Sequence, residues 1–181
     1  MRVFTGKGDD GTTGLYFGGR VAKDHPRTEA VGALDEAQAV IGVARAAAPL
    51  DGGLHAQLTA VARDLYVVMA EVATADENRH KLVAGTTLIT AEHVVAIEAA
   101  TDVAATQFPP LTDFTIPGQT SLTAGLDLAR TVVRRAERRV VTVAAPGSQV
   151  LPYLNRLSSL LWALARVEEA ADAGTLLAKD S

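Results

Sequence analysis

Apolar residues recur in alternating steps of four and three along much of the chain, the spacing that gathers them on one face of an α-helix. One such run in the second half of the chain comprises Leu122, Leu126, Ala129, Val133, Ala136, Val140 and Val143. One in the first half comprises Leu54, Leu58, Val61, Leu65, Val68 and Val72. Each run predicts a long helix that buries one apolar face against neighbouring helices.

Helix start and stop signals divide the chain into five such helices. The first is predicted over residues 27–48, because Pro49 follows it. Thr90 and Ser121 are suited to cap the third and fourth helices, and Pro152 is suited to open the fifth. Long amphipathic helices with short connections predict an all-α fold, an up-and-down five-helix bundle.

The N-terminal segment lacks this periodicity. Residues 1–25 are rich in glycine and threonine, a composition that favours turns, with at most one short strand near residues 14–18. We therefore expect a single domain over residues 1–181, in which this loop precedes a helical bundle over residues 26–171.

Composition and charge exclude several classes of function. The chain has 181 residues, 48% of them hydrophobic, enough to bury one core. Its net charge of -4 argues against nucleic acid as a partner, because binding a phosphate backbone requires a broad basic surface. It has no cysteine and its histidines lack ligand spacing, so we predict neither thiolate catalysis nor a metal site. No signal peptide or bilayer-length apolar run is seen, so we expect a cytoplasmic protein without a membrane partner.

The fourth predicted helix carries a run of arginines within this acidic chain. They are Arg130, Arg134, Arg135, Arg138 and Arg139, with Glu137 among them. Arg130 and Arg134 fall beside the apolar face, where partial exclusion of water makes a guanidinium unfavourable unless an anion pairs with it. This pattern indicates a polyanion site, although a solvated face with surface ion pairs would produce the same run.

Three further segments carry candidate chemistry. The N-terminal loop combines glycines, threonines and Lys7, which suits a phosphate chain, although flexible termini often have this composition. Asp35 lies at the edge of the apolar face of the first helix, where a carboxylate calls for an arginine partner unless it faces solvent. On the fifth helix, Asn155, Trp162 and Arg166 belong to a mixed polar and aromatic face beside the leucines, where Asn155 could bind a ligand or a neighbouring helix.

Together these segments resemble the PduO-type ATP:cob(I)alamin adenosyltransferases. The family pattern consists of GDxGxTxL, RVxKD, GxxDE, RxxxRRAER and YLNRLS in that order. The chain carries these motifs at residues 8–15, 20–24, 32–36, 130–138 and 153–158. It departs from the family at Asp10, where a basic residue is common.

The resemblance implies an enzyme that transfers the 5′-deoxyadenosyl group of ATP to Co(I) of a reduced corrinoid, giving adenosylcobalamin and triphosphate. It also implies a homotrimer that binds magnesium-ATP and cobalamin, or a related corrinoid, between subunits. The nucleotide-binding residues of one subunit would be Thr5, Gly6, Lys7, Gly8, Thr13, Gly14 and Lys23. Those of the adjacent subunit would be Arg134, Arg135, Glu137, Arg138 and Asn155.

Four residues are expected to take part in the reaction itself. By resemblance, Asp35 and Arg130 form an ion pair at the subunit boundary beside the corrinoid. Arg134 would stabilise the leaving triphosphate, and Phe114 would pack under the corrin ring and displace its lower axial base. A corrinoid reductase and an adenosylcobalamin-dependent mutase are the further partners that the resemblance suggests.

Two other classes of protein remain open at this point. A carrier or sensor would bind both ligands without turnover. A helical scaffold would use the same charges in interface ion pairs and would bind no ATP tightly.

Overall fold

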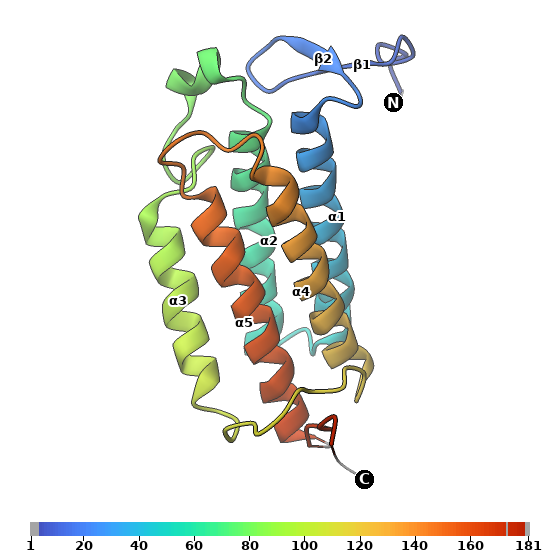
Figure 1. Ribbon diagram of the computed structural model, residues 1–181, viewed down its shortest axis with the longest axis vertical. Coiled ribbons are helices and arrows are strands. Elements are labelled where there is room, and N and C mark those ends of the chain that lie inside the picture. Colours follow the sequence, from blue (N-terminus) through green and yellow to red (C-terminus); the bar gives the residue numbers. More distant parts are fainter. Residues whose placement is uncertain (1–3, 173, 180–181) are drawn as a thin grey trace.

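The computed structural model describes residues 4–172 and 174–179. Five α-helices of this part of the chain run alternately up and down, which confirms the predicted all-α, up-and-down bundle (Figure 1). These helices are α1 (Pro26–Ala47), α2 (Gly53–Val72), α3 (Ala91–Ala105), α4 (Ser121–Val140) and α5 (Val150–Ala171). None of the described helices is both long enough and apolar enough to cross a bilayer.

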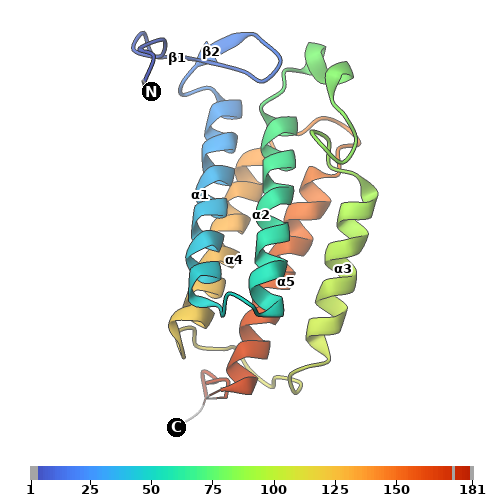
Figure 2. The same ribbon diagram turned by 180° about the vertical axis from the view of Figure 1, so that it is seen from behind.

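Helix α4 is central to the bundle. It packs against both α1 and α5, while α2 lies beside α1 and α3 lies beside α5 (Figures 1 and 2). The predicted apolar face of α4 is buried at Leu126, Ala129, Val133, Ala136 and Val140. Gly125 permits the close contact with α1, because a Cβ there would lie 3.2 Å from the Cα of Ala44. One face of α4 is therefore fixed in the core along its length.

Most helix ends lie close to their predicted positions. Thr90 caps α3 as expected. Helix α4 is capped by Thr120 rather than by Ser121, because the Thr120 side chain is the one that accepts a hydrogen bond from the third backbone N–H of the helix. Helix α5 begins at Val150, so Pro152 lies within its first turn, where its missing N–H removes no helical hydrogen bond.

The N-terminal segment contains a hairpin rather than one strand near residues 14–18. Strands β1 (Thr12–Gly14) and β2 (Arg20–Ala22) pair antiparallel, and residues 15–19 form the connection. Three successive residues of this connection, Phe17, Gly18 and Gly19, have positive φ angles, which reverse the chain. The prediction missed the hairpin because Phe17 is not a residue that normally marks such a turn.

A buried carboxylate joins the connections at the end of the bundle nearest the hairpin. Glu71 is 1% exposed and accepts hydrogen bonds from Arg79 (2.8 Å), the Ser148 hydroxyl (2.6 Å) and the backbone N–H of Ile89 (3.0 Å). Arg79 belongs to a short 3-10 helix, η1 (Asp76–Lys81), and Ser148 to the α4–α5 connection. These contacts hold three separate chain segments together.

Candidate functional site

The hairpin brings the predicted loop residues together at the start of α1. Arg20 donates a hydrogen bond of 2.7 Å to the carbonyl of Lys7, and the backbone N–H of Lys23 donates one of 2.9 Å to the carbonyl of Gly11. A Cβ at Gly8 would lie 3.2 Å from Nζ of Lys23, so glycine allows this ammonium to lie against the loop. The geometry places a cation over exposed backbone, an arrangement that suits phosphate oxygens.

The remaining predicted loop residues lie in the hairpin or in the turns that precede it. Lys7 donates its backbone N–H to the hydroxyl of Thr5 at 3.4 Å, and Gly6 accepts a hydrogen bond from the backbone of Asp9. Thr13 pairs with Val21 and Gly14 with Arg20 across the two strands. The structure therefore gathers all seven loop residues predicted to bind the nucleotide into one exposed unit.

Asp10, the departure from the family pattern, has a structural role in this hairpin. Its carboxylate accepts hydrogen bonds from the backbone N–H (2.9 Å) and the hydroxyl (2.8 Å) of Thr12, which hold the pKa of Asp10 below its ordinary value. Arg20 forms an ion pair with it at 3.5 Å. Arg20 thus offsets the negative charge that Asp10 adds beside the proposed phosphate loop.

The C-terminal end of α4 lies beside the start of α1. Arg138 lines a pocket of about 300 Å³ together with Asp24, from the segment that leaves the hairpin, and Glu29 of α1. Nearby, Nδ2 of Asn155 donates a hydrogen bond of 3.3 Å to Oε1 of Glu137, across α4 and α5. The structure thus places two of the predicted nucleotide ligands, Glu137 and Asn155, in contact, and places Arg138 at the hairpin end of the bundle.

A second pocket, of about 410 Å³, opens between α3, α4 and α5. Its lining includes Arg130 and Arg134 of α4 and Trp162 of α5, with Ser159 adding a hydroxyl. Arg134 is exposed and forms no hydrogen bond or ion pair with another described residue. Two guanidiniums beside an indole ring suit a ligand that combines anionic groups with a flat apolar surface.

The predicted partners Asp35 and Arg130 are not in contact within one chain. Asp35 is exposed on α1 and lines a different pocket with Arg45, whereas Arg130 has its Nε 3.6 Å from Oδ1 of Asp127. The ion pair that joins α1 to α4 is instead formed by Glu36 with Arg135, another of the predicted nucleotide ligands. An Asp35–Arg130 pair between two subunits stays a prediction, since one chain does not test it.

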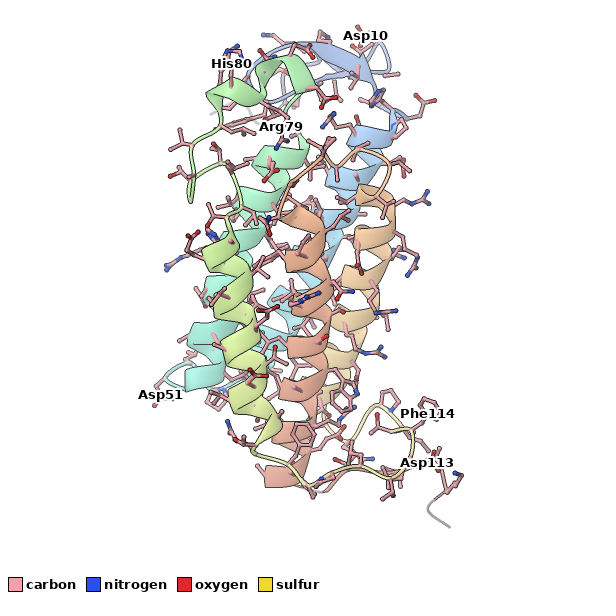
Figure 3. The ribbon with its side chains drawn as sticks, turned by 60° about the vertical axis from the view of Figure 1, so that its left-hand side comes forward. Asp10, Asp51, Arg79, His80, Asp113 and Phe114 are labelled. Carbon is pink, nitrogen blue, oxygen red and sulfur yellow. The ribbon has the colours of Figure 1, made fainter. Side chains whose placement is uncertain are left out.

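Phe114 lies far from the hairpin. Phe114 is 85% exposed in the loop between α3 and α4, and Figure 3 shows it at the opposite end of the bundle from Asp10. A single chain therefore does not bring Phe114 and the nucleotide-binding loop into one site.

Two features of the site were missed by the sequence analysis. Trp162 was assigned to a mixed face but not to a ligand pocket, and its ring also meets Phe108 edge to face, with centroids 5.7 Å apart. Arg166, assigned to the same face, is fully buried with the carboxylates of Asp127 and Glu169. The sequence carried little signal for this cluster, because Asp127 and Arg166 fall beside the apolar runs of α4 and α5 and not within them.

Comparison with known proteins identifies relatives along nearly the whole chain. The chain is 41% identical over 173 residues to the corrinoid adenosyltransferase PduO of Salmonella typhimurium, covering 94% of this chain and 50% of that protein. It is 39% identical over 173 residues to the corrinoid adenosyltransferase of Mycobacterium tuberculosis, covering 92% of this chain and 88% of that protein. The chain thus spans about half the length of the Salmonella relative and most of the mycobacterial one.

Solved structures share the fold. A variant of the PduO-type ATP:corrinoid adenosyltransferase from Lactobacillus reuteri, complexed with cobalamin and ATP, superposes with a TM-score of 0.87 at 27% identity. That match covers 99% of this chain and 100% of the other. The family model described as cobalamin adenosyltransferase matches residues 3–168. The chain therefore belongs to the cobalamin adenosyltransferase family.

Proposed function

We propose that the protein transfers the 5′-deoxyadenosyl group of ATP to Co(I) of a reduced corrinoid and releases triphosphate. Family membership supports the reaction, and one structural observation supports its location. Arg134 has no partner among the described residues, yet it shares a pocket with Arg130 and Trp162. A cation beside an apolar ring in an open pocket is suited to a substrate that brings its own negative charge.

The proposed chemistry needs little from the protein beyond position and charge. Co(I) is the nucleophile: a Co–C bond forms to the 5′ carbon of ATP as the C–O bond to the triphosphate breaks, and the triphosphate leaves with that electron pair. No general base is required, because the nucleophile carries no proton. The protein must align the two substrates and stabilise the charge that develops on the leaving group. We assign that stabilisation to Arg134 and Lys23.

The remaining predicted residues form the nucleotide part of the site. We propose that the hairpin, from Thr5 to Lys23, surrounds the phosphates of ATP, and that Arg135, Arg138, Asn155 and Glu137 of another subunit complete the site. Magnesium bound to ATP keeps phosphate and water ligands and needs few protein carboxylates. We propose that Glu137 is such a carboxylate.

We propose a homotrimer with its sites between subunits. The hairpin and Phe114 lie at opposite ends of one bundle, so one site containing both would require two chains. Asp35, exposed and without a partner among the described residues, is then available to Arg130 of the neighbouring subunit. Phe114 would pack under the corrin ring in place of the axial nitrogen. A cytoplasmic location, a reductase that supplies the electron and a mutase that receives the product remain predictions of the same proposal.

The test is an anaerobic reaction of cob(II)alamin with the protein, magnesium-ATP and a strong reductant. We expect the light-sensitive spectrum of an alkylcobalamin to form together with one triphosphate per product. Binding of both ligands without product would indicate a carrier or sensor instead.

A thermal-shift measurement with magnesium-ATP distinguishes a nucleotide-binding protein from a helical scaffold that binds no ATP. A ligand at one hundred times its dissociation constant stabilises the folded state by about 2.7 kcal/mol. No shift at millimolar magnesium-ATP would refute nucleotide binding. Sedimentation analysis should give three times the chain mass of 18.9 kDa, and a monomer at assay concentration would refute the shared site.

A further inference from the structure

A buried charge cluster lies between the pocket and the loop that carries Phe114. Arg166 of α5 is 0% exposed and its NH2 group donates to Oδ2 of Asp127 at 2.6 Å and to Oε1 of Glu169 at 2.8 Å. Its NH1 group donates to the hydroxyl of Thr115 at 2.7 Å. One guanidinium therefore joins α4, α5 and the α3–α4 loop.

Both sides of this cluster reach residues of the proposed site. Asp127 also lies 3.6 Å from Nε of Arg130, and the Arg166 guanidinium lies 5.7 Å from the ring centroid of Trp162. Arg130 and Trp162 line the pocket between α3, α4 and α5. On the other side, Thr115 directly follows Phe114. The cluster thus connects the pocket wall to the residue that follows Phe114.

The Phe114 loop has a second attachment. The carbonyl of Phe114 accepts a hydrogen bond of 2.8 Å from the backbone of Ala178, and the backbone of Ile116 donates one of 2.9 Å to Leu176. These bonds hold the backbone on both sides of Thr115 to the segment after α5. The contact between Thr115 and Arg166 adds a side-chain link from this segment to α5 and, through Asp127, to α4.

Stability alone does not account for the cluster. Buried ion pairs can often be replaced by apolar residues without loss of stability, because desolvation offsets their attraction. Here Nε of Arg166 and Oε2 of Glu169 are also buried without a hydrogen-bond partner. The two carboxylates carry one more negative charge than Arg166 can balance, and the nearby guanidinium of Arg130 supplies the second positive charge. The position of Arg130 is therefore coupled to the same cluster.

We propose that Arg166 is a positioning residue that sets the Phe114 loop relative to the pocket lined by Arg130 and Trp162. It acts through Thr115 and Asp127 and touches no substrate itself. This inference rests on the proposed adenosyltransferase function. In this proposal, the buried cluster aligns the phenylalanine that packs under the corrin ring with the pocket wall that carries the arginines.

The test compares two substitutions at Thr115. Thr115→Val keeps the branched shape but removes the acceptor for Arg166, whereas Thr115→Ser keeps the acceptor and serves as the matched control. We expect Thr115→Val to lower kcat about tenfold and to leave the KM for ATP unchanged. The loss of one hydrogen bond to a charged group would reduce the population of the correctly positioned loop by about this factor. Thr115→Ser should stay within about twofold of the unsubstituted protein.

A spectroscopic readout separates position from general damage. The electron paramagnetic resonance spectrum of bound cob(II)alamin reports whether the lower nitrogen ligand is attached, and Thr115→Val should increase the attached fraction. Arg166→Lys should produce the same change, because a single ammonium cannot span both Asp127 and Thr115. Equal kcat and spectra for the Val and Ser variants would overturn the proposal.

Hydrogen exchange tests the cluster without any reaction. In Thr115→Val the amides of Ile116 and Ala178 should exchange faster than in Thr115→Ser. Unchanged exchange would overturn the positioning role whether or not the protein is an enzyme. An unsubstituted protein that forms no alkylcobalamin would instead refute the proposed function, a result that is distinct from a failure of the Thr115 comparison.

Discussion

Replacement of Arg134 by alanine provides a direct test of the proposed chemistry, because the structure predicts a kinetic loss without a structural one. The side chain is exposed on α4 and contacts no described residue through a hydrogen bond or ion pair. Alanine is a good helix former, so the free energy of unfolding should change by no more than about 0.5 kcal/mol. The melting temperature should then shift by at most about 2 °C. A loss of activity in a variant that melts at nearly the same temperature must then reflect an effect on the reaction itself.

The kinetic effect follows from the charge that the leaving triphosphate acquires. Removal of one preorganised donor at such a position lowers kcat by about 10²–10³-fold, equivalent to about 2.7–4 kcal/mol. Arg134→Lys keeps the charge but loses the planar pair of donors, so we expect an intermediate loss. The assay is the initial rate of alkylcobalamin formation with both substrates saturating, together with a thermal melt of each variant.

A matched control is available on α2. Arg63 is also exposed and has no ion pair or hydrogen bond to another described residue, so Arg63→Ala removes one surface charge away from the pocket. Its kcat should match that of the unsubstituted protein. The reasoning is wrong if Arg134→Ala keeps kcat within about threefold of Arg63→Ala, a ratio too small for a donor to the leaving group.

Two further predictions concern stability. Glu71→Ala leaves Arg79 and Ser148 without their buried acceptor and should lower the free energy of unfolding by about 3 kcal/mol in urea denaturation; a loss below about 1 kcal/mol would contradict the assigned contacts. Burial, and secondarily the adjacent carboxylate of Asp64, raise the pKa of Tyr153 well above its ordinary value of 10.0. The folded state therefore retains a proton that the unfolded state loses, so stability should fall as pH rises past 10.0, and the fall should be smaller in Tyr153→Phe.

The bundle could be predicted because helical periodicity is a local property of the chain. The predicted apolar run on α4 is buried from Leu126 to Val140, and the cap at Thr90 depends on residues three positions apart. The hairpin was not predicted, because its turn depends on a positive φ at Phe17, a conformation that bulky residues rarely adopt. Local rules succeed where each residue has its usual conformation and fail where one residue does not.

For the candidate site, the family motifs named residues that the structure places in contact, within the N-terminal loop and across two helices. The contact of Glu137 with Asn155 and the position of Lys23 against Gly8 bring together residues that the family motifs had named. The cluster around Arg166 was not predicted, because a buried guanidinium becomes acceptable only when carboxylates from other elements reach it. Such pairing depends on the tertiary arrangement and leaves little trace in the spacing of one helix.

The position of the arginines on α4 shows how a core helix could serve the proposed reaction, in which no protein residue acts as the nucleophile. Arg130 and Arg138 are eight residues apart, about 12 Å along the helix axis, so one rigid element spans the pocket and the nucleotide end of the site. The apolar face of the same helix is fixed in the core at Ala129, Val133 and Ala136. Because alignment of two substrates is the main requirement, a small shift of α4 would change the rate as much as loss of a contact. The tight packing of α4 against α1 is therefore part of the catalytic design that we propose, as well as of the fold.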